Sequence, residues 1–103
     1  MTTLDNLLKL VGTPRDGALL RFSLGNEYLK TDDPARAAEH LARAVALDPG
    51  FTAAWKLYGK ALAAAGRDDE ALAAYREGIA VAAARGDKQA EKEMRVFARR
   101  LEK

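Results

Sequence analysis

The chain lacks cysteine altogether and has only three prolines among its 103 residues. Without cysteine it can form no disulfide, no thiolate metal site and no thiol nucleophile. It also has no run of about 18 apolar residues, the length that a transmembrane helix needs. Residues 1–11 lack a basic region and carry only a short, interrupted apolar run, so we expect no signal peptide. These absences predict a cytoplasmic protein.

Charge of one sign is also scarce. Seventeen Lys and Arg against fifteen Asp and Glu leave a formal net charge of +2, which is too small to indicate a nucleic-acid partner. The most basic segment, residues 85–103, interleaves acids with its cations at salt-bridging spacing, as in Glu91 and Arg95. Mixed charge of this kind favours a solvated helix face. We therefore expect neither nucleic acid nor membrane as a partner.

Residues that could form a catalytic or metal site are equally sparse. His40 is the single histidine, and a catalytic or metal site needs several convergent groups. The acidic clusters at residues 32–33 and 68–70 lie at predicted helix starts, where capping and the helix dipole explain them. No Gly-rich phosphate loop is present. The sequence predicts no catalytic residue, no metal and no cofactor.

What the chain does contain is helix formers, with 49% hydrophobic and 31% charged residues, a globular composition. No segment alternates apolar and polar residues as a strand does. Gly and Pro, often beside Asp, interrupt the helical pattern at intervals. The sequence predicts a single all-α domain over residues 1–103, with helices near residues 3–11, 17–30, 34–47, 52–65, 68–85 and 87–102.

An internal repeat of 34 residues organises these helices. Gly25 and Gly59 are 34 residues apart, and each directly follows a bulky residue in the sequence. Leu41 and Tyr75 are separated by the same interval. A glycine inside a helix costs about 1 kcal/mol relative to alanine. Its recurrence at one period indicates a packing role, because a missing side chain lets two helices approach closely.

These segments resemble the tetratricopeptide repeat family, whose unit is a 34-residue antiparallel helix pair. The first repeat would cover about residues 18–51 and the second about 52–85, followed by a capping helix at about 87–102. Ala83 stands where the family usually has Pro, so the second helix of repeat two should continue to Arg85. The matching residues are Leu24, Gly25, Tyr28, Ala37, Leu41, Ala44 and Pro49, then Trp55, Tyr58, Gly59, Ala71 and Tyr75.

The resemblance implies non-catalytic protein–protein interaction, with a peptide or partner helix held in a concave groove. By register, the candidate contacts are Phe22 as an apolar anchor and Asn26, Lys56 and Lys60 as polar groups. Lys56 and Lys60 are four residues apart and share a helix face. Some family members clamp a carboxylate with a five-residue set, of which only Asn26 is present here. The last helix should contribute Ala90, Glu91 and Met94 to the groove.

Two other functions remain open from the sequence. With two repeats the array is short, and either end could pack against a second copy to give a homo-oligomer. An enzyme or nucleotide-binding domain is the third possibility, disfavoured because no constellation of catalytic residues is present.

Overall fold

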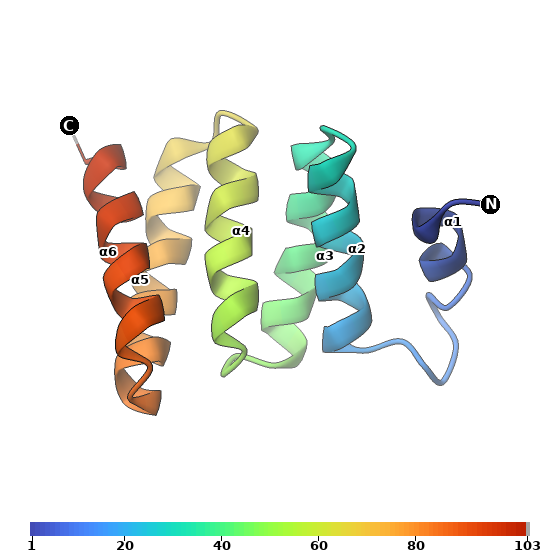
Figure 1. Ribbon diagram of the computed structural model, residues 1–103, viewed down its shortest axis with the longest axis horizontal. Coiled ribbons are helices and arrows are strands. Elements are labelled where there is room, and N and C mark those ends of the chain that lie inside the picture. The colour runs from blue at the N-terminus through green and yellow to red at the C-terminus, as the bar shows by residue number, and fades with distance from the viewer. Residues whose placement is uncertain (103) are drawn as a thin grey trace.

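The computed structural model describes residues 1–102, and in that range every regular element is a helix, which confirms the all-α class (Figure 1). The first helix is shorter than predicted. Residues 9–11 close tighter turns, with the Leu10 and Val11 amides bonded three residues back, before Gly12 adopts a φ of +79°. The helices are α1 (Thr3–Leu8), α2 (Ala18–Lys30), α3 (Pro34–Leu47), α4 (Thr52–Ala64), α5 (Asp68–Arg85) and α6 (Lys88–Leu101).

Three helix starts are fixed by side-chain caps. Thr2 and Asp5 form a reciprocal capping box on α1, Asp33 accepts from the Arg36 amide on α3, and Asp87 accepts from the Ala90 amide on α6. Each cap satisfies an amide that has no partner inside its helix. The predicted Asp68 cap is wrong: Arg67 occupies that position without a side-chain bond, and Asp68 is the first helical residue of α5.

Each hairpin closes where a buried glycine admits a large side chain of the opposite helix. The side chain of Leu41 on α3 fills the space that a Cβ on Gly25 of α2 would need. The ring of Tyr75 on α5 fills the equivalent space at Gly59 of α4, where a Cβ would lie 2.5 Å from Cε1. The recurring glycines therefore serve close helix packing, as their 34-residue interval predicts.

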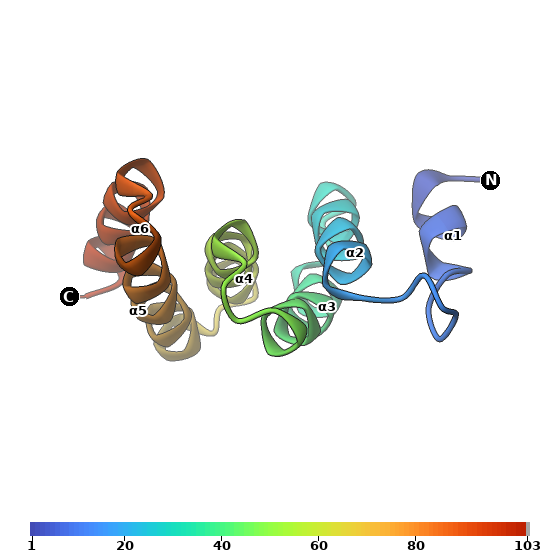
Figure 2. The same ribbon diagram turned by 90° about the horizontal axis from the view of Figure 1, so that it is seen from below.

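The helices form an array in which each hairpin lies beside the next (Figure 1). Seen along the helices, α2, α4 and α6 lie on one side and α3 and α5 on the other, with α4 set lower than its two neighbours (Figure 2). We call the face formed by α2, α4 and α6 the trough. Helix α4 contacts both α2 and α6 along this face. Within residues 1–102 no helix is both long and apolar enough to cross a membrane.

Helix α6 packs closely on α5 at a third glycine. A Cβ on Gly78 would lie 2.5 Å from the sulfur of Met94, so α6 approaches α5 as closely as partners within a hairpin do. Met94 is fully buried and Ala90 nearly so. The prediction that these two residues face the trough is therefore wrong, because the apolar stripe of α6 is used for packing on α5. Helix α5 ends at Arg85, as predicted.

Candidate functional site

A hollow of about 390 Å³ lies between α2 and α4, at the end where α2 turns into α3. It brings together Asn26 and Lys60, two of the four residues that the sequence singled out. Leu29 and Leu57 contribute apolar surface. The hollow therefore offers one ligand an amide, a cation and an apolar wall. Its lining residues are Asn26, Leu29, Lys30, Asp32, Pro34, Leu57, Lys60 and Ala64.

The three lysines of the trough are not equivalent. Lys30 lies 3.4 Å from Glu27 of its own helix, and Lys56 lies 3.4 Å from Glu93 of α6. Lys60 is exposed and makes no ion pair within residues 1–102. Because Lys56 is already engaged, Lys60 is the cation best placed to meet an incoming carboxylate.

The structure places Phe22 and Lys56 outside this hollow. The Phe22 ring lies 4.9 Å from that of Phe51 and is partly buried against the core. Lys56 and Glu93 are both more than a third exposed and join α4 to the capping helix, an arrangement that contributes little stability at the surface. The sequence-predicted site is thus divided, with Asn26 and Lys60 at one position and the other two residues elsewhere along the array.

Several contributors were missed by sequence reasoning. In the sequence-based prediction Leu57 and Pro34 have no part in the site and Asp32 belongs only to a helix start, yet all three line the hollow. Asp32 has a φ of 59°, which turns the chain between α2 and α3. A connection of only three residues necessarily lies next to the ends of both helices, and that is the signal which could have placed Asp32 and Pro34.

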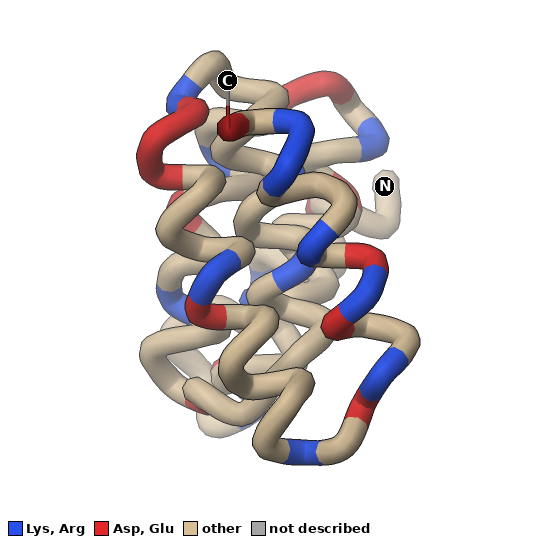
Figure 3. The backbone as a smooth tube through the Cα atoms, turned by 90° about the vertical axis from the view of Figure 1, so that its left-hand side faces the viewer, with Lys and Arg blue, Asp and Glu red and all other residues tan. Residues whose placement is uncertain are grey.

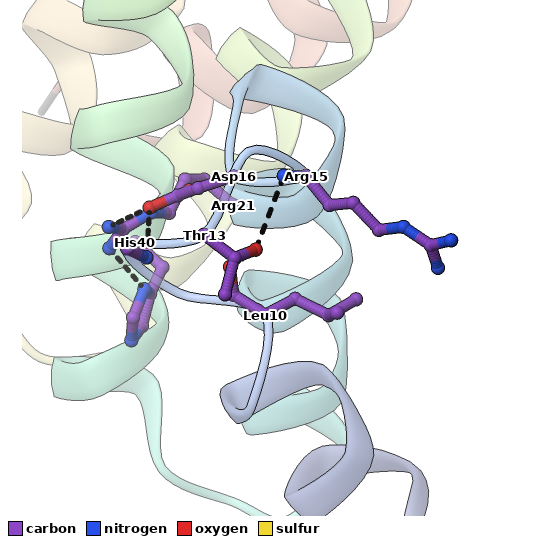
Figure 4. Close-up of polar contacts among 7 residues, drawn as sticks. Leu10, Thr13, Arg15, Asp16, Arg21 and His40 are labelled. Atoms are coloured by element: carbon purple, nitrogen blue, oxygen red, sulfur yellow. Dashed lines mark hydrogen bonds and ion pairs between the residues drawn. The ribbon is translucent and has the colours of Figure 1, made fainter.

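A second polar cluster ties the segment before α2 to the first hairpin (Figure 4). Arg21 binds Asp16 through two hydrogen bonds of 3.0 and 2.9 Å, and its Nη1 lies 3.2 Å from Nδ1 of His40. The Gly12 amide also donates to Asp16, at 2.9 Å. A guanidinium can only donate, so Nδ1 of His40 accepts and the proton resides on Nε2. The His40 ring stacks on that of Tyr28 at 5.4 Å.

The contacts of this cluster need an ionised Asp16 and a neutral His40, and the pKa shifts of both groups favour these forms. The Arg21 hydrogen bonds, with that of the Gly12 amide, lower the pKa of Asp16 to about 2. Burial, followed by the nearby Arg21 charge, lowers the pKa of His40 below its usual value. Neutral imidazole with its Nδ1 occupied by an arginine is poorly placed for proton transfer at that atom. His40 therefore acts here as a structural acceptor.

The described part of the chain, residues 1–102, contains no group of three or more His, Asp or Glu residues that could hold a metal ion.

Besides Asp16, Tyr75 has a strongly shifted pKa, which burial raises to about 12. Its ring packs against Gly59 and lies 5.6 Å from that of Phe97, so it belongs to the core.

Comparison with known proteins gives consistent results. A family model described as tetratricopeptide repeat matches residues 22–90. A TPR repeat-containing protein of Pseudomonas aeruginosa is 52% identical over 100 residues, which cover 97% of this chain and 95% of that protein. Among solved structures, a Bordetella parapertussis protein is 38% identical with a TM-score of 0.83, covering 98% of this chain and 88% of that one. A tetratricopeptide repeat domain protein of Salinibacter ruber is 28% identical with a TM-score of 0.76, covering 84% and 97%.

Proposed function

This chain belongs to the tetratricopeptide repeat family, and on that premise we propose that it is a non-catalytic binding module for a peptide or partner helix. The fold is one that generally mediates protein–protein interaction. Catalysis would need nucleophiles, acids or bases gathered in one place, and the polar side chains that line the hollow between α2 and α4 are one amide, two ammonium groups and a single carboxylate.

The observation that carries the proposal is the hollow between α2 and α4. At about 390 Å³ it accommodates a few residues of an extended segment, not a whole folded surface. Asn26 can both donate to and accept from a peptide backbone, Leu29 and Leu57 receive an apolar side chain, and Lys60 receives an acidic group. The preferred ligand is therefore a short segment that carries an apolar residue beside an acidic one.

Phe22 and Lys56 have a different part in this proposal. Phe22 extends the apolar surface along the trough from the hollow, and a longer ligand would reach it. Lys56 becomes available only if a ligand carboxylate replaces Glu93, an exchange between two exposed anions that costs little. The four residues thus form one primary position and two secondary ones.

The proposal is tested by selecting peptides from a displayed random library on the intact chain and measuring their affinity by fluorescence polarisation. Lys60→Glu should weaken the selected peptides by about tenfold or more, since an attraction becomes a repulsion in a partly enclosed site. Lys9→Glu, the same change at the residue that follows α1 and away from the trough, is the matched control. Equal affinities for both variants, or no enriched peptide at all, would overturn the assignment.

A further inference from the structure

A second hollow, on the other side of the array, has an acidic rim and an aromatic floor. It encloses about 280 Å³ and is lined by Trp55 and Tyr58 of α4 and by Glu70, Ala73, Ala74 and Glu77 of α5. We call it the α5 hollow. The two rings are tilted with their centroids 6.3 Å apart, and the Trp55 indole is fixed by a 2.7 Å hydrogen bond to the Pro49 carbonyl.

The charge of the α5 hollow is only partly neutralised. Glu70 receives two hydrogen bonds from Arg67, at 3.0 and 2.6 Å. Glu77 is exposed and makes no ion pair with any residue of the described range 1–102. The hollow therefore suits a cationic side chain that can lie against an aromatic face.

The outward face of α6 carries the opposite charge. The buried residues Ala90, Met94 and Ala98 mark the inner side of this helix. On the opposite side, helical spacing places one exposed apolar residue among cations. One of these cations, Arg95, is bonded to Glu91 at 2.9 Å, and Lys88, Lys92 and Arg99 make no ion pair within residues 1–102. Figure 3 looks onto this end of the molecule, where Lys and Arg recur along the helix with acidic residues between them. The face consists of Lys88, Lys92, Arg95, Val96 and Arg99, and Val96 is 36% exposed.

We infer that the basic face of α6 docks into the α5 hollow of a second copy of this chain. Lys92 and Arg99 are seven residues apart, as are Glu70 and Glu77, so two turns of each helix span about the same 10 Å. Val96 lies between the two cations as Ala73 and Ala74 lie between the two carboxylates. Two helices laid side by side can thus align both charge pairs around one apolar contact.

The contact has to be intermolecular. On α5, Leu72 and Ile79 pack with α6 of the same chain, and helical spacing places Glu70, Ala73 and Glu77 on the opposite face. The basic face of α6 therefore points away from the hollow of its own chain. Because the two surfaces differ, the association is head-to-tail and leaves one unused surface on each end copy. Growth beyond a dimer, or closure into a ring, follows from this geometry.

Sedimentation velocity of the full chain over a wide concentration range tests the inference. We expect species larger than the monomer that increase with concentration. They should disperse when ionic strength rises from about 0.1 M to about 1 M, which shortens the Debye length from about 10 Å to about 3 Å. Emission from Trp55, the single tryptophan, should shift to the blue on association, because the hollow becomes covered. A monomer at every concentration at low salt would overturn the inference.

Charge reversal identifies the surfaces. Glu77→Lys and Arg99→Glu should each weaken self-association by about tenfold, and an equimolar mixture of the two variants should recover it, since each supplies the charge the other lost. Arg43→Glu makes the same change on α3, where the exposed Arg43 lines a separate hollow with Gly12 and Thr13, and it should leave association unchanged. Association that tolerates both reversals, or a mixture that fails to recover, contradicts this pairing. Circular dichroism verifies that each variant is folded.

Discussion

The aromatic ring of Tyr75 lies so close to the backbone of Gly59 that a Cβ on Gly59 would stand 2.5 Å from Cε1 and 2.7 Å from Cδ1. Gly25 and Leu41 have the same relationship one repeat earlier. Both large side chains are almost fully buried, so neither can move aside. The two hairpins are therefore closed by one device, repeated with a different side chain.

Gly59→Ala should destabilise the protein although alanine is the better helix former. Overpacking a filled core costs about 1–3 kcal/mol, against a helix-propensity gain of at most about 1 kcal/mol. We expect a lower urea midpoint for unfolding. In a Tyr75→Ala background the same change should become neutral or stabilising, because the obstructing ring is absent. A destabilisation of the same size in both backgrounds would show that the ring is not the obstacle.

Removing the cap of α6 should have a smaller, local effect. Asp87→Ala leaves the Ala90 amide without its acceptor and should cost about 1 kcal/mol. Asp87→Asn keeps an oxygen in the same place and should retain most of that stability. Urea unfolding of the two variants measures the difference, and equal losses would argue against a capping role.

The Asp32 turn should prefer glycine. Asp32 has a φ of 59°, in the left-handed region that Gly adopts without cost and Ala does not. Asp32→Gly should leave the unfolding free energy unchanged or slightly higher, whereas Asp32→Ala should lower it by about 1 kcal/mol. Thermal unfolding followed by circular dichroism separates the two variants. Identical behaviour would mean that the turn is not under conformational constraint.

Acidification should weaken the Asp16–Arg21–His40 cluster in two separate pH ranges. The pKa of His40 is lower in the folded chain than its ordinary 6.5, so the unfolded chain binds more protons and stability falls as pH drops from about 6.5 towards the folded pKa. Asp16 has a folded pKa of about 2, so its contribution falls between about pH 4 and pH 2.

His40→Gln should abolish the first of these losses and leave the second in place. Unfolding free energy measured from neutral to acidic pH tests this, and nitrogen NMR of the imidazole should find the proton on Nε2 at neutral pH. A proton on Nδ1, or a stability that rises as pH falls below 6.5, would contradict the arrangement of the cluster.

Sequence periodicity was sufficient for the helices and for the contacts inside each hairpin, because Gly25, Gly59 and their partners recur at a fixed interval. It was insufficient to predict which side chains of the trough are available to a ligand. Met94 was expected there, yet its side chain packs against Gly78 in the core. Lys56 was expected to be available, yet Glu93 reaches it from a helix 37 residues away in sequence. Neither contact is local, so no spacing rule within one helix could have predicted it.

The central claim is that the hollow holding Asn26 and Lys60 is where this module binds its protein ligand. The most direct measurement is an NMR titration of the isotope-labelled chain with a selected peptide. We predict that the side-chain amide of Asn26 and the methyl groups of Leu29 and Leu57 shift most, in proportion to bound peptide. Shifts that gather instead around Trp55 and Glu77, with Asn26 unaffected, would contradict the claim.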